Sequence, residues 1–136
     1  MTYLDYRSCF SHSCMNLFML NIHSLRKKLN LLEAEMARLG WPKVVILPES
    51  WLEPGTEDYY HISGYRDYHI TRPDGYGGLS VYVQDHTRHS FIRSRSCGAD
   101  AVQIISIRFL DLDFDLHAIY RRPDERNLMG FFCGTG

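Results

Sequence analysis

One acidic side chain, Glu49, follows the short apolar run Val44–Leu47 and precedes Ser50 and Trp51. Three residues of the run are β-branched, which predicts a strand buried on both faces, and Pro48 should end it because proline lacks an N–H for an interior ladder. In α/β sheets ligands bind at strand ends, and a carboxylate there suits a hard cation such as Mg²⁺. From the pattern alone a solvated loop carboxylate is the commoner explanation, so both interpretations remain open.

Two further clusters have metal-ligand residue types. Cys9, His12 and Cys14 lie close together, but no second ligand pair stands at a zinc-finger spacing, so reduced thiols are the simpler interpretation. The three aspartates within Asp111–Asp115 alternate along the chain, which indicates a polar hairpin turn facing solvent more than a cation site. The seven histidines are scattered, and none is expected to pair with a serine or cysteine nucleophile.

The basic side chains that could face a polyanion are few. Arg26, Lys27 and Lys28 fall in the first turn of a predicted helix, where the helix macrodipole disfavours cations and a nearby phosphate backbone would offset that cost. Arg72 and the Arg121–Arg122 pair are candidates for the same DNA-facing rim. For all of them a solvated protein surface is the alternative.

Length and composition describe an ordinary globular domain. The chain has 136 residues, is 45% hydrophobic and 23% charged, and has a net charge of -1. There is thus no overall basic field, and polyanion binding would need local charge. No apolar run approaches the roughly 20 residues of a membrane span, and Asp5 and Arg7 within the first ten residues argue against a signal peptide. We expect an intracellular protein, nuclear or cytoplasmic, without membrane partners.

The apolar patterns predict a strand, a helix and then mainly strands. A buried strand over Met15–Asn21 is followed by a helix with Ser24 as N-cap and a stop at Gly40. Its apolar stripe comprises Leu25, Leu29, Leu32, Met36 and Leu39. The later predicted strands are Val44–Leu47, Tyr68–Thr71, Leu79–Val83, Phe91–Arg93, Ala101–Phe109 and Phe114–Tyr120, the last two as an antiparallel hairpin.

This order predicts an α/β (α+β) layered fold on a mixed, largely antiparallel sheet. Residues 14–127 should form the domain, residues 1–13 a poorly ordered lead-in, and residues 128–136 an unstructured tail.

Four motifs in the chain resemble, in the same order, the endonuclease domain of non-LTR (LINE-type) retrotransposons. They are Asn21-Ile22-His23-Ser24-Leu25-Arg26-Lys27-Lys28, Pro48-Glu49-Ser50-Trp51-Leu52, Gly64-Tyr65 with Gly77-Gly78-Leu79-Ser80-Val81-Tyr82-Val83, and Ile119-Tyr120-Arg121-Arg122-Pro123. These domains belong to the endonuclease/exonuclease/phosphatase superfamily, which includes DNase I. The resemblance implies a four-layer sandwich of two packed sheets flanked by helices, present here in part.

The resemblance also implies roles for three residues. Glu49 matches the glutamate that holds the catalytic divalent cation, Mg²⁺ or Mn²⁺, and Asn21 matches the asparagine near the metal and the scissile phosphate. Tyr120 matches the tyrosine that hydrogen-bonds the phosphate. From the residues alone, Asn21 is equally a turn residue and Tyr120 a core tyrosine.

The chain departs from the family pattern in two ways. His23 replaces an arginine, Pro48 a threonine and Arg122 a proline, and Tyr76 stands where a basic residue precedes the glycines. The motifs of the family's second half, which should activate the water, have no counterpart.

We therefore expect a truncated retroelement endonuclease domain with weak or absent DNA nicking. The alternatives are a non-catalytic remnant that binds polyanions and a phosphatase of the same superfamily. Half a sandwich should also leave an apolar sheet face uncovered, which predicts aggregation or partial order.

Overall fold

A computed structural model describes the backbone of residues 3–10, 13–97, 102–121 and 130–134, and the side chains of residues 16–97 and 102–121. This part of the chain contains nine strands, one α-helix and one 3-10 helix. The strands are β1 (Tyr3–Phe10), β2 (Ser13–Leu20), β3 (Val44–Pro48), β4 (Tyr65–Ile70), β5 (Leu79–Gln84), β6 (His89–Cys97), β7 (Val102–Phe109), β8 (Phe114–Arg121) and β9 (Gly130–Gly134). The helices are α1 (Leu29–Arg38) and η1 (Glu57–Tyr60).

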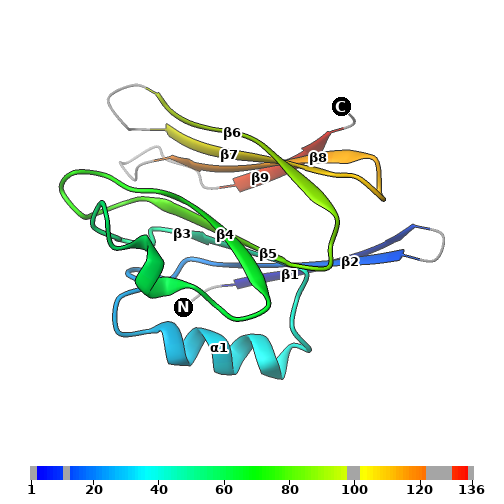
Figure 1. Cartoon of the computed structure of the whole chain (residues 1–136), viewed down its shortest axis with the longest axis horizontal. Helices are drawn as coiled ribbons and strands as arrows, with labels where there is room; N and C mark the ends of the chain where they lie inside the picture. Colours follow the sequence, from blue (N-terminus) through cyan, green and yellow to red (C-terminus); the bar gives the residue numbers. More distant parts are fainter. Residues whose placement is uncertain (1–2, 11–12, 98–101, 122–129, 135–136) are drawn as a thin grey trace.

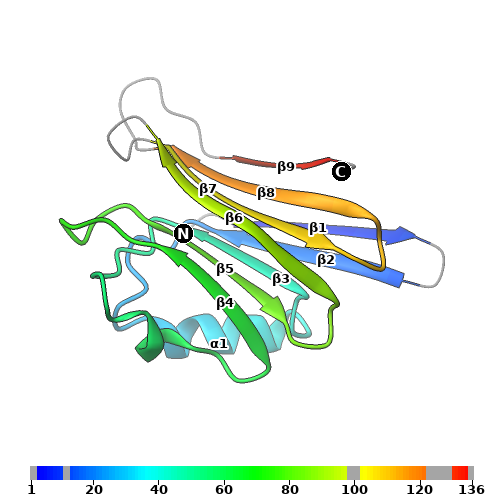
Figure 2. The ribbon, with the colours of Figure 1, turned by 45° about the horizontal axis from the view of Figure 1, so that its top comes forward.

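The strands form two sheets that lie face to face, with α1 on the far side of one of them (Figure 1). Sheet A has the order β1-β2-β3-β5-β4 and sheet B the order β6-β7-β8-β9 (Figure 2). Among the described strands β2 and β3 pair in parallel, and the other neighbours pair antiparallel. The prediction of a partial α/β sandwich with mixed, largely antiparallel sheets is confirmed.

Strand β3 is buried on both faces, as its continuous apolar run predicts. Val44 and Ile46 belong to the core between the two sheets, whereas Val45 and Leu47 belong to the core between sheet A and α1. Since successive side chains of a strand point to opposite faces, one four-residue run contributes to both cores. All five residues of β3, including Pro48, are buried.

The hairpin of β7 and β8 supplies the other half of the inter-sheet core. Ile105, Ile107 and Phe109 alternate along β7, and Leu116, Ala118 and Tyr120 alternate along β8; all six are buried against sheet A. The register pairs Gln103 with Tyr120 and Phe109 with Phe114, so the predicted antiparallel hairpin is confirmed.

The helix begins later than predicted. Its first residue is Leu29, and Lys28 occupies the N-cap position without a side-chain capping bond. Ser24 is therefore not the cap, and Arg26 and Lys27 precede the helix instead of forming its first turn. The reason is tertiary: the backbone N–H of Ser24 donates to the carbonyl of Glu49 at 2.9 Å, which holds this segment against the end of β3.

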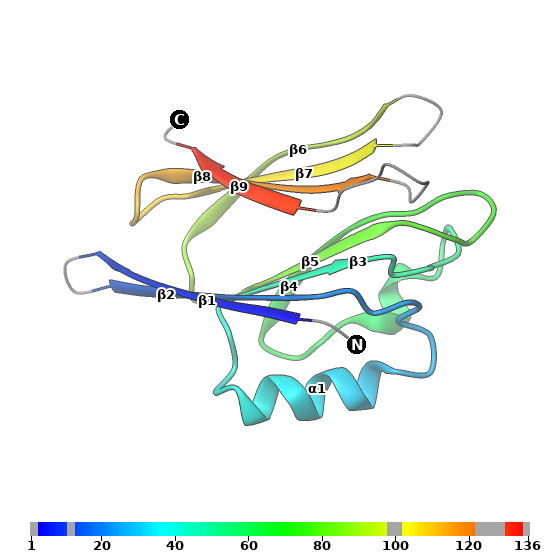
Figure 3. The ribbon, with the colours of Figure 1, turned by 180° about the vertical axis from the view of Figure 1, so that it is seen from behind.

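The structure differs from the sequence-based expectation at both ends of the chain. Residues 3–10, predicted as a disordered lead-in, form β1 against β2, and residues 130–134 of the predicted unstructured tail form β9 against β8. The two strands lie at the same side of the sandwich (Figure 3). Neither segment has strong strand periodicity, and the ladder of the neighbouring strand supplies the missing hydrogen-bond partners.

Two internal strands are longer than their local patterns predict. Strand β6 has nine residues instead of the three of Phe91–Arg93, and β4 begins at Tyr65 instead of Tyr68. Most of β6 is exposed, so it lacks the apolar alternation on which the prediction relied. Pairing with β7 along its length accounts for the extension.

The described residues form three layers of the expected four: α1, sheet A and sheet B (Figure 1). The inner faces of the two sheets cover each other. The prediction of an uncovered apolar sheet face is therefore not met at the inner faces, because the described residues contain both sheets. Within the described part of the chain no helix lies on the outer face of sheet B, and no helix is long and apolar enough to cross a membrane.

Candidate functional site

Two loops with strained backbone meet where β2 and β3 end. Seven described non-glycine residues have positive φ, and five of them fall in these loops: His23, Ser24, Lys27, Glu49 and Trp51. Each such residue costs free energy, so the surrounding structure has to impose it, and residues of this kind cluster at functional sites. The strained segments therefore mark this end of sheet A as a candidate site.

Backbone hydrogen bonds impose the conformation of Glu49–Trp51. On one side the N–H groups of Ser24 and Leu25 donate to the carbonyls of Glu49 and Ser50 at 2.9 and 2.7 Å. On the other side the N–H groups of Glu49 and Trp51 donate to the carbonyls of Gly78 and Gly77, both at 2.9 Å. The segment is thus held between the β2–α1 loop and the turn before β5.

The Glu49 carboxylate is buried and lies between two polar side chains. The Tyr120 hydroxyl donates to Oε1 at 3.0 Å, and Nδ1 of His23 lies 3.0 Å from Oε2. The Glu49 side chain is 10% exposed and that of His23 58%, so the carboxylate has a buried side and a side that reaches solvent. The structure brings Glu49 and Tyr120 together although they lie on different sheets.

Asn21 directly follows β2 and is half-buried. The parallel register pairs Met19 with Ile46, so Asn21 and Glu49 leave the carboxyl ends of adjacent strands two and three residues later. Side chains in such positions share one edge of a sheet. Asn21 and Glu49 thus follow the same ends of two adjacent parallel strands.

Arg72 is buried beside the turn at Gly77 instead of forming an exposed rim. Its Nη2 lies 3.2 Å from Oδ2 of Asp74, and within the described residues its buried Nε has no hydrogen-bond partner. A Cβ added to Gly77 would lie 3.3 Å from Nη1 of Arg72 and 3.7 Å from Cε2 of Tyr120. The glycine therefore lets the guanidinium group pack close to the Tyr120 ring.

The other predicted nucleic-acid contacts differ in their partners and exposure. Arg26 lies 3.4 Å from the exposed carboxylate of Glu53, and Lys27 is exposed. Lys28 donates to the carbonyls of Ile22 and His23, both at 2.9 Å. Arg121 points to the outer face of sheet B, since Tyr120 next to it points inward.

Three aromatic side chains, His23, Trp51 and Tyr76, lie one after another beginning next to Glu49, and we call them the aromatic row. The rings of His23 and Trp51 are 6.4 Å apart and those of Trp51 and Tyr76 5.3 Å apart, both in edge-to-face arrangements. Sequence reasoning missed this row and treated His23 and Tyr76 only as departures from a motif. The aromatic residue types were a visible signal, but their proximity depends on the turn at Gly77–Gly78.

Two histidines pair with serines, contrary to the sequence-based expectation. Ser80 Oγ lies 2.7 Å from Nδ1 of His69, whose Nε2 lies 2.6 Å from Asp67, and Ser106 lies 2.7 Å from His117. Ser80, His69 and Asp67 are connected in the order of a catalytic triad. Ser80 is fully buried, however, so substrate cannot reach it, and these three residues form a structural network.

The Asp67 carboxylate is the charged member of this network. Its other oxygen, Oδ1, lies 2.8 Å from Nδ1 of His61. Burial alone would raise the pKa of Asp67, but the hydrogen bonds from His69 and His61 outweigh it and lower the pKa below the ordinary aspartate value.

The aspartates of the β7–β8 hairpin are engaged in ion pairs. Arg108 binds Asp115 through Nε at 2.8 Å, and Arg88 binds Asp111 at 2.7 Å. Asp115 is buried, which differs from the predicted solvent-facing position because the arginine side chain packs along it. Cys9, His12 and Cys14 lie outside the described side chains.

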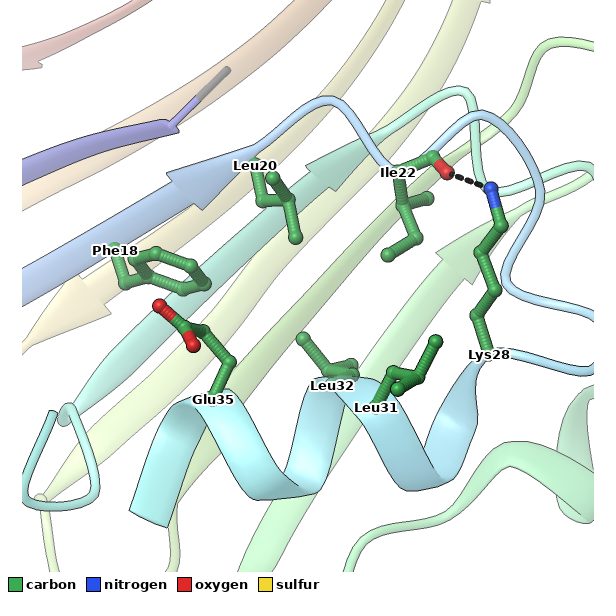
Figure 4. A pocket seen from close by; sticks show the side chains of 7 residues that line it. All are labelled: Phe18, Leu20, Ile22, Lys28, Leu31, Leu32 and Glu35. Atoms are coloured by element: carbon green, nitrogen blue, oxygen red, sulfur yellow. Dashed lines mark hydrogen bonds between the residues drawn. The ribbon is translucent and has the colours of Figure 1, made fainter. Parts of the chain in front are cut away.

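An apolar groove runs between α1 and β2 (Figure 4). It has a volume of about 330 Å³ and is lined mainly by Phe18, Leu20, Ile22, Leu31 and Leu32, with Lys28 and Glu35 at its ends. The groove lies on the α1 side of sheet A, and its lining does not include Glu49, Asn21 or Tyr120. It is therefore separate from the polar site.

The donor atoms at the site fit a hard cation held by a single protein carboxylate. Glu49 offers two carboxylate oxygens, and the nearby Asn21 carries an amide oxygen. Mg²⁺ accepts such a set because it keeps several waters and binds through one or two carboxylates. Among the described residues there is no group of three or more histidine, cysteine or acidic side chains arranged for a metal ion.

No protein-family model and no curated protein matches this sequence. A solved structure of D. rerio TDP2, humanized by 14 mutations, is similar with a TM-score of 0.55 and 19% identity, over 82% of this chain and 49% of that chain. The catalytic domain of human Nocturnin, solved with a bound sulfate anion, is similar with a TM-score of 0.46 and 13% identity, over 97% of this chain and 50% of that chain.

Both of these proteins belong to the endonuclease/exonuclease/phosphatase superfamily. The likeness to TDP2 shows a DNase I-like α/β sandwich fold. The chain spans about half the length of either solved chain.

Proposed function

We propose that the chain corresponds to the N-terminal half of a divalent-cation-dependent phosphodiester hydrolase, an endonuclease domain of the LINE-type retroelement kind that acts on DNA. The observation that carries the proposal is the 3.0 Å hydrogen bond from Tyr120 to Glu49 at the strand ends where Asn21 also lies. The DNase I-like fold supports the hydrolase class, and the four sequence motifs support the retroelement type.

Each residue of the site has a distinct proposed role. Glu49 and Asn21 would hold Mg²⁺ or Mn²⁺ through oxygen atoms, and a bound cation would supply charge neutralisation at the phosphate and at the leaving oxygen. The Tyr120 hydroxyl donates to Glu49 and, because Tyr120 is fully buried, it orients that carboxylate instead of making the phosphate contact that the resemblance implies. Arg72 places a fixed positive charge beside Tyr120, which favours an anionic substrate.

We propose that nicking by this chain is weak or absent. Phosphodiester hydrolysis needs a group that accepts the proton of the attacking water, and neither Asn21 nor Tyr120 is suited to that role at neutral pH. Within the described residues Glu49 is not part of a group of three or more histidine, cysteine or acidic side chains that could hold a metal ion.

A non-catalytic polyanion-binding remnant is the second candidate. The cationic Arg72 and Tyr120 both lie close to Gly77, and His23 lies 3.0 Å from the Glu49 carboxylate, so the site has groups that could hold a phosphate without cleaving it. This candidate predicts binding of DNA that persists when the Glu49 carboxylate is removed.

A supercoiled-plasmid assay with Mg²⁺ or Mn²⁺ separates the two candidates. The variant is Glu49→Gln, and the control is Glu53→Gln, which removes a carboxylate four residues away whose side chain is 62% exposed. Slow, metal-dependent nicking that disappears in Glu49→Gln and persists in Glu53→Gln supports the hydrolase.

DNA binding without nicking in all three proteins supports the remnant. Nicking that is unchanged in Glu49→Gln contradicts the assignment of the site. Metal binding is measured in parallel by calorimetric titration of Mn²⁺, and equal affinity of the wild type and Glu49→Gln contradicts the cation site.

A further inference from the structure

The aromatic row presents exposed ring surface next to the site. Tyr76 is 57% exposed, and its ring contacts Trp51 edge-to-face at an interplanar angle of 73°. An edge-to-face contact with Trp51 engages at most one face of the Tyr76 ring, and the exposure of Tyr76 leaves ring surface accessible to a planar ligand. Single exposed aromatic residues are normal on protein surfaces, whereas three in contact beside a buried carboxylate call for a physical reason.

The position of the row is fixed by its backbone. The Tyr76 N–H donates to Oδ1 of Asp74 at 3.0 Å, and the other oxygen of Asp74 pairs with the buried Arg72. Trp51 has φ of 55° and is held by the carbonyl of Gly77. A binding surface that is already ordered loses little conformational entropy when a ligand stacks on it.

The row is also directly connected to the polar site. His23 contacts Trp51 through its ring and Glu49 through Nδ1, and Glu49 contacts Tyr120. A ligand whose phosphate is held through the proposed cation at Glu49, and whose aromatic group lies a short distance away, would contact both parts at once. A nucleotide has this chemistry, because each phosphate is joined through a sugar to a base with two π faces.

We propose that the aromatic row is a stacking platform for a nucleobase adjacent to the phosphodiester at Glu49 and Tyr120. The proposal rests on the proposed function and names its substrate class: a nucleic acid with an unpaired or displaced base, in preference to a phosphate ester without a base. Stacking on aromatic side chains tolerates any base, so the platform selects for a base and not for a sequence.

Fluorescence of Trp51 provides a direct measurement. The chain contains two tryptophans, so Trp41→Phe leaves Trp51 as the single reporter. This protein is titrated with a short single-stranded oligodeoxynucleotide and with an abasic strand of equal length and charge, both in the presence of Mg²⁺, since the proposed function has a cation between Glu49 and the phosphate. We expect the base-bearing strand to quench Trp51 and to bind more tightly than the abasic strand.

Tyr76→Ala and Tyr76→Leu test the platform, with Phe91→Ala as the matched control. Phe91 is an exposed aromatic residue that stacks on Tyr68 at 5.0 Å. In the sheet it pairs with Ile107 of β7, whereas Tyr120 pairs with Gln103, four residues away on the same strand. We expect both Tyr76 variants to weaken binding of the base-bearing strand by roughly five- to 150-fold without affecting the abasic strand. Tyr76→Phe and Phe91→Ala should bind like the parent.

Equal binding of the two strands by the parent overturns the proposal, as does an equal loss for both strands in Tyr76→Leu. Since Tyr76 is exposed, far-UV circular dichroism of each variant should match the parent. Failure of the proposed function and failure of the stacking proposal can be told apart. Nicking that is unchanged in Glu49→Gln refutes the hydrolase site, whereas the preference for the base-bearing strand is measured separately by Trp51 fluorescence.

Discussion

Tyr120 and Glu49 are 71 residues apart in the chain, and a buried hydrogen bond of 3.0 Å joins them. Tyr120 belongs to β8 of sheet B, whereas Glu49 follows β3 of sheet A, so the bond links the two sheets at the edge of their shared core. The site exists only when the two sheets are packed together.

The coupling between these two residues is measurable by a double-mutant cycle. Tyr120→Phe removes the donor and leaves the buried carboxylate with one partner fewer, which should lower the free energy of unfolding by about 1.5–3 kcal/mol. In a Glu49→Gln background the same change should cost only about 0.5–1.5 kcal/mol, because the acceptor is neutral. Urea unfolding of the four proteins gives the coupling energy.

Additive effects of the two substitutions would contradict a direct bond between Tyr120 and the Glu49 carboxylate. Tyr68→Phe is the control, since its hydroxyl bonds His89, away from Glu49. Its effect should be the same in both backgrounds.

Substitution of Gly78 should be among the most damaging single changes. Gly78 has φ of +84°, and an added Cβ would lie 3.0 Å from the carbonyl oxygen of Ile70 and 3.1 Å from Oγ of Ser50. Gly78→Ala therefore combines left-handed backbone strain of about 1–2 kcal/mol with a clash against backbone that cannot move freely. Thermal unfolding should show the loss.

Gly55→Ala separates these two contributions. Gly55 has φ of +89°, but nothing lies within 4 Å of an added Cβ, so this variant contains the backbone strain without the clash. We expect Gly55→Ala to be clearly less destabilised than Gly78→Ala. Equal effects would mean that the packing between Gly78 and Ser50 is looser than the structure indicates.

The Asp67 network should make stability fall in acid. The hydrogen bonds from His69 and His61 hold the pKa of folded Asp67 below its value of about 3.9 in the unfolded chain. The stabilisation is thus fully present well above pH 3.9 and is lost as the pH falls through the lowered folded pKa. Asp67→Asn should be less stable at pH 7 and should flatten this acidic decline.

Urea midpoints measured from pH 7 down to pH 3 check this expectation. Asp58→Asn is a suitable control, because Asp58 is exposed on η1. A decline that is as steep in Asp67→Asn as in the wild type would contradict the role of Asp67.

The sequence predicted those parts of the fold that are encoded locally. Alternation or a continuous apolar run located β3, β5 and the β7–β8 hairpin, and the apolar stripe located α1. The strands β1, β6 and β9 were missed or shortened because their ladders depend on neighbouring strands more than on their own residue patterns.

The same distinction applies to the site. Glu49 was predicted at a strand end because the apolar run and Pro48 are adjacent to it. The contact of His23 with Glu49 and the burial of Arg72 could not be predicted, because they depend on how the β2–α1 loop packs against Glu49 and how the turn at Gly77 packs against Trp51. Residue types alone therefore suggested a solvent-facing basic rim where the structure has a buried cation.

The Tyr120–Glu49 contact joins the two sheets. A ligand that binds both groups therefore binds only the folded state in which the two sheets are packed together. Mass action would then shift the population toward that state by RT ln(1 + [L]/Kd). The midpoint temperature of unfolding would rise with solute concentration, even for an occupant that is never chemically altered. Ligand binding at the site could thus be measured as an increase in the midpoint temperature of unfolding, without any catalytic turnover.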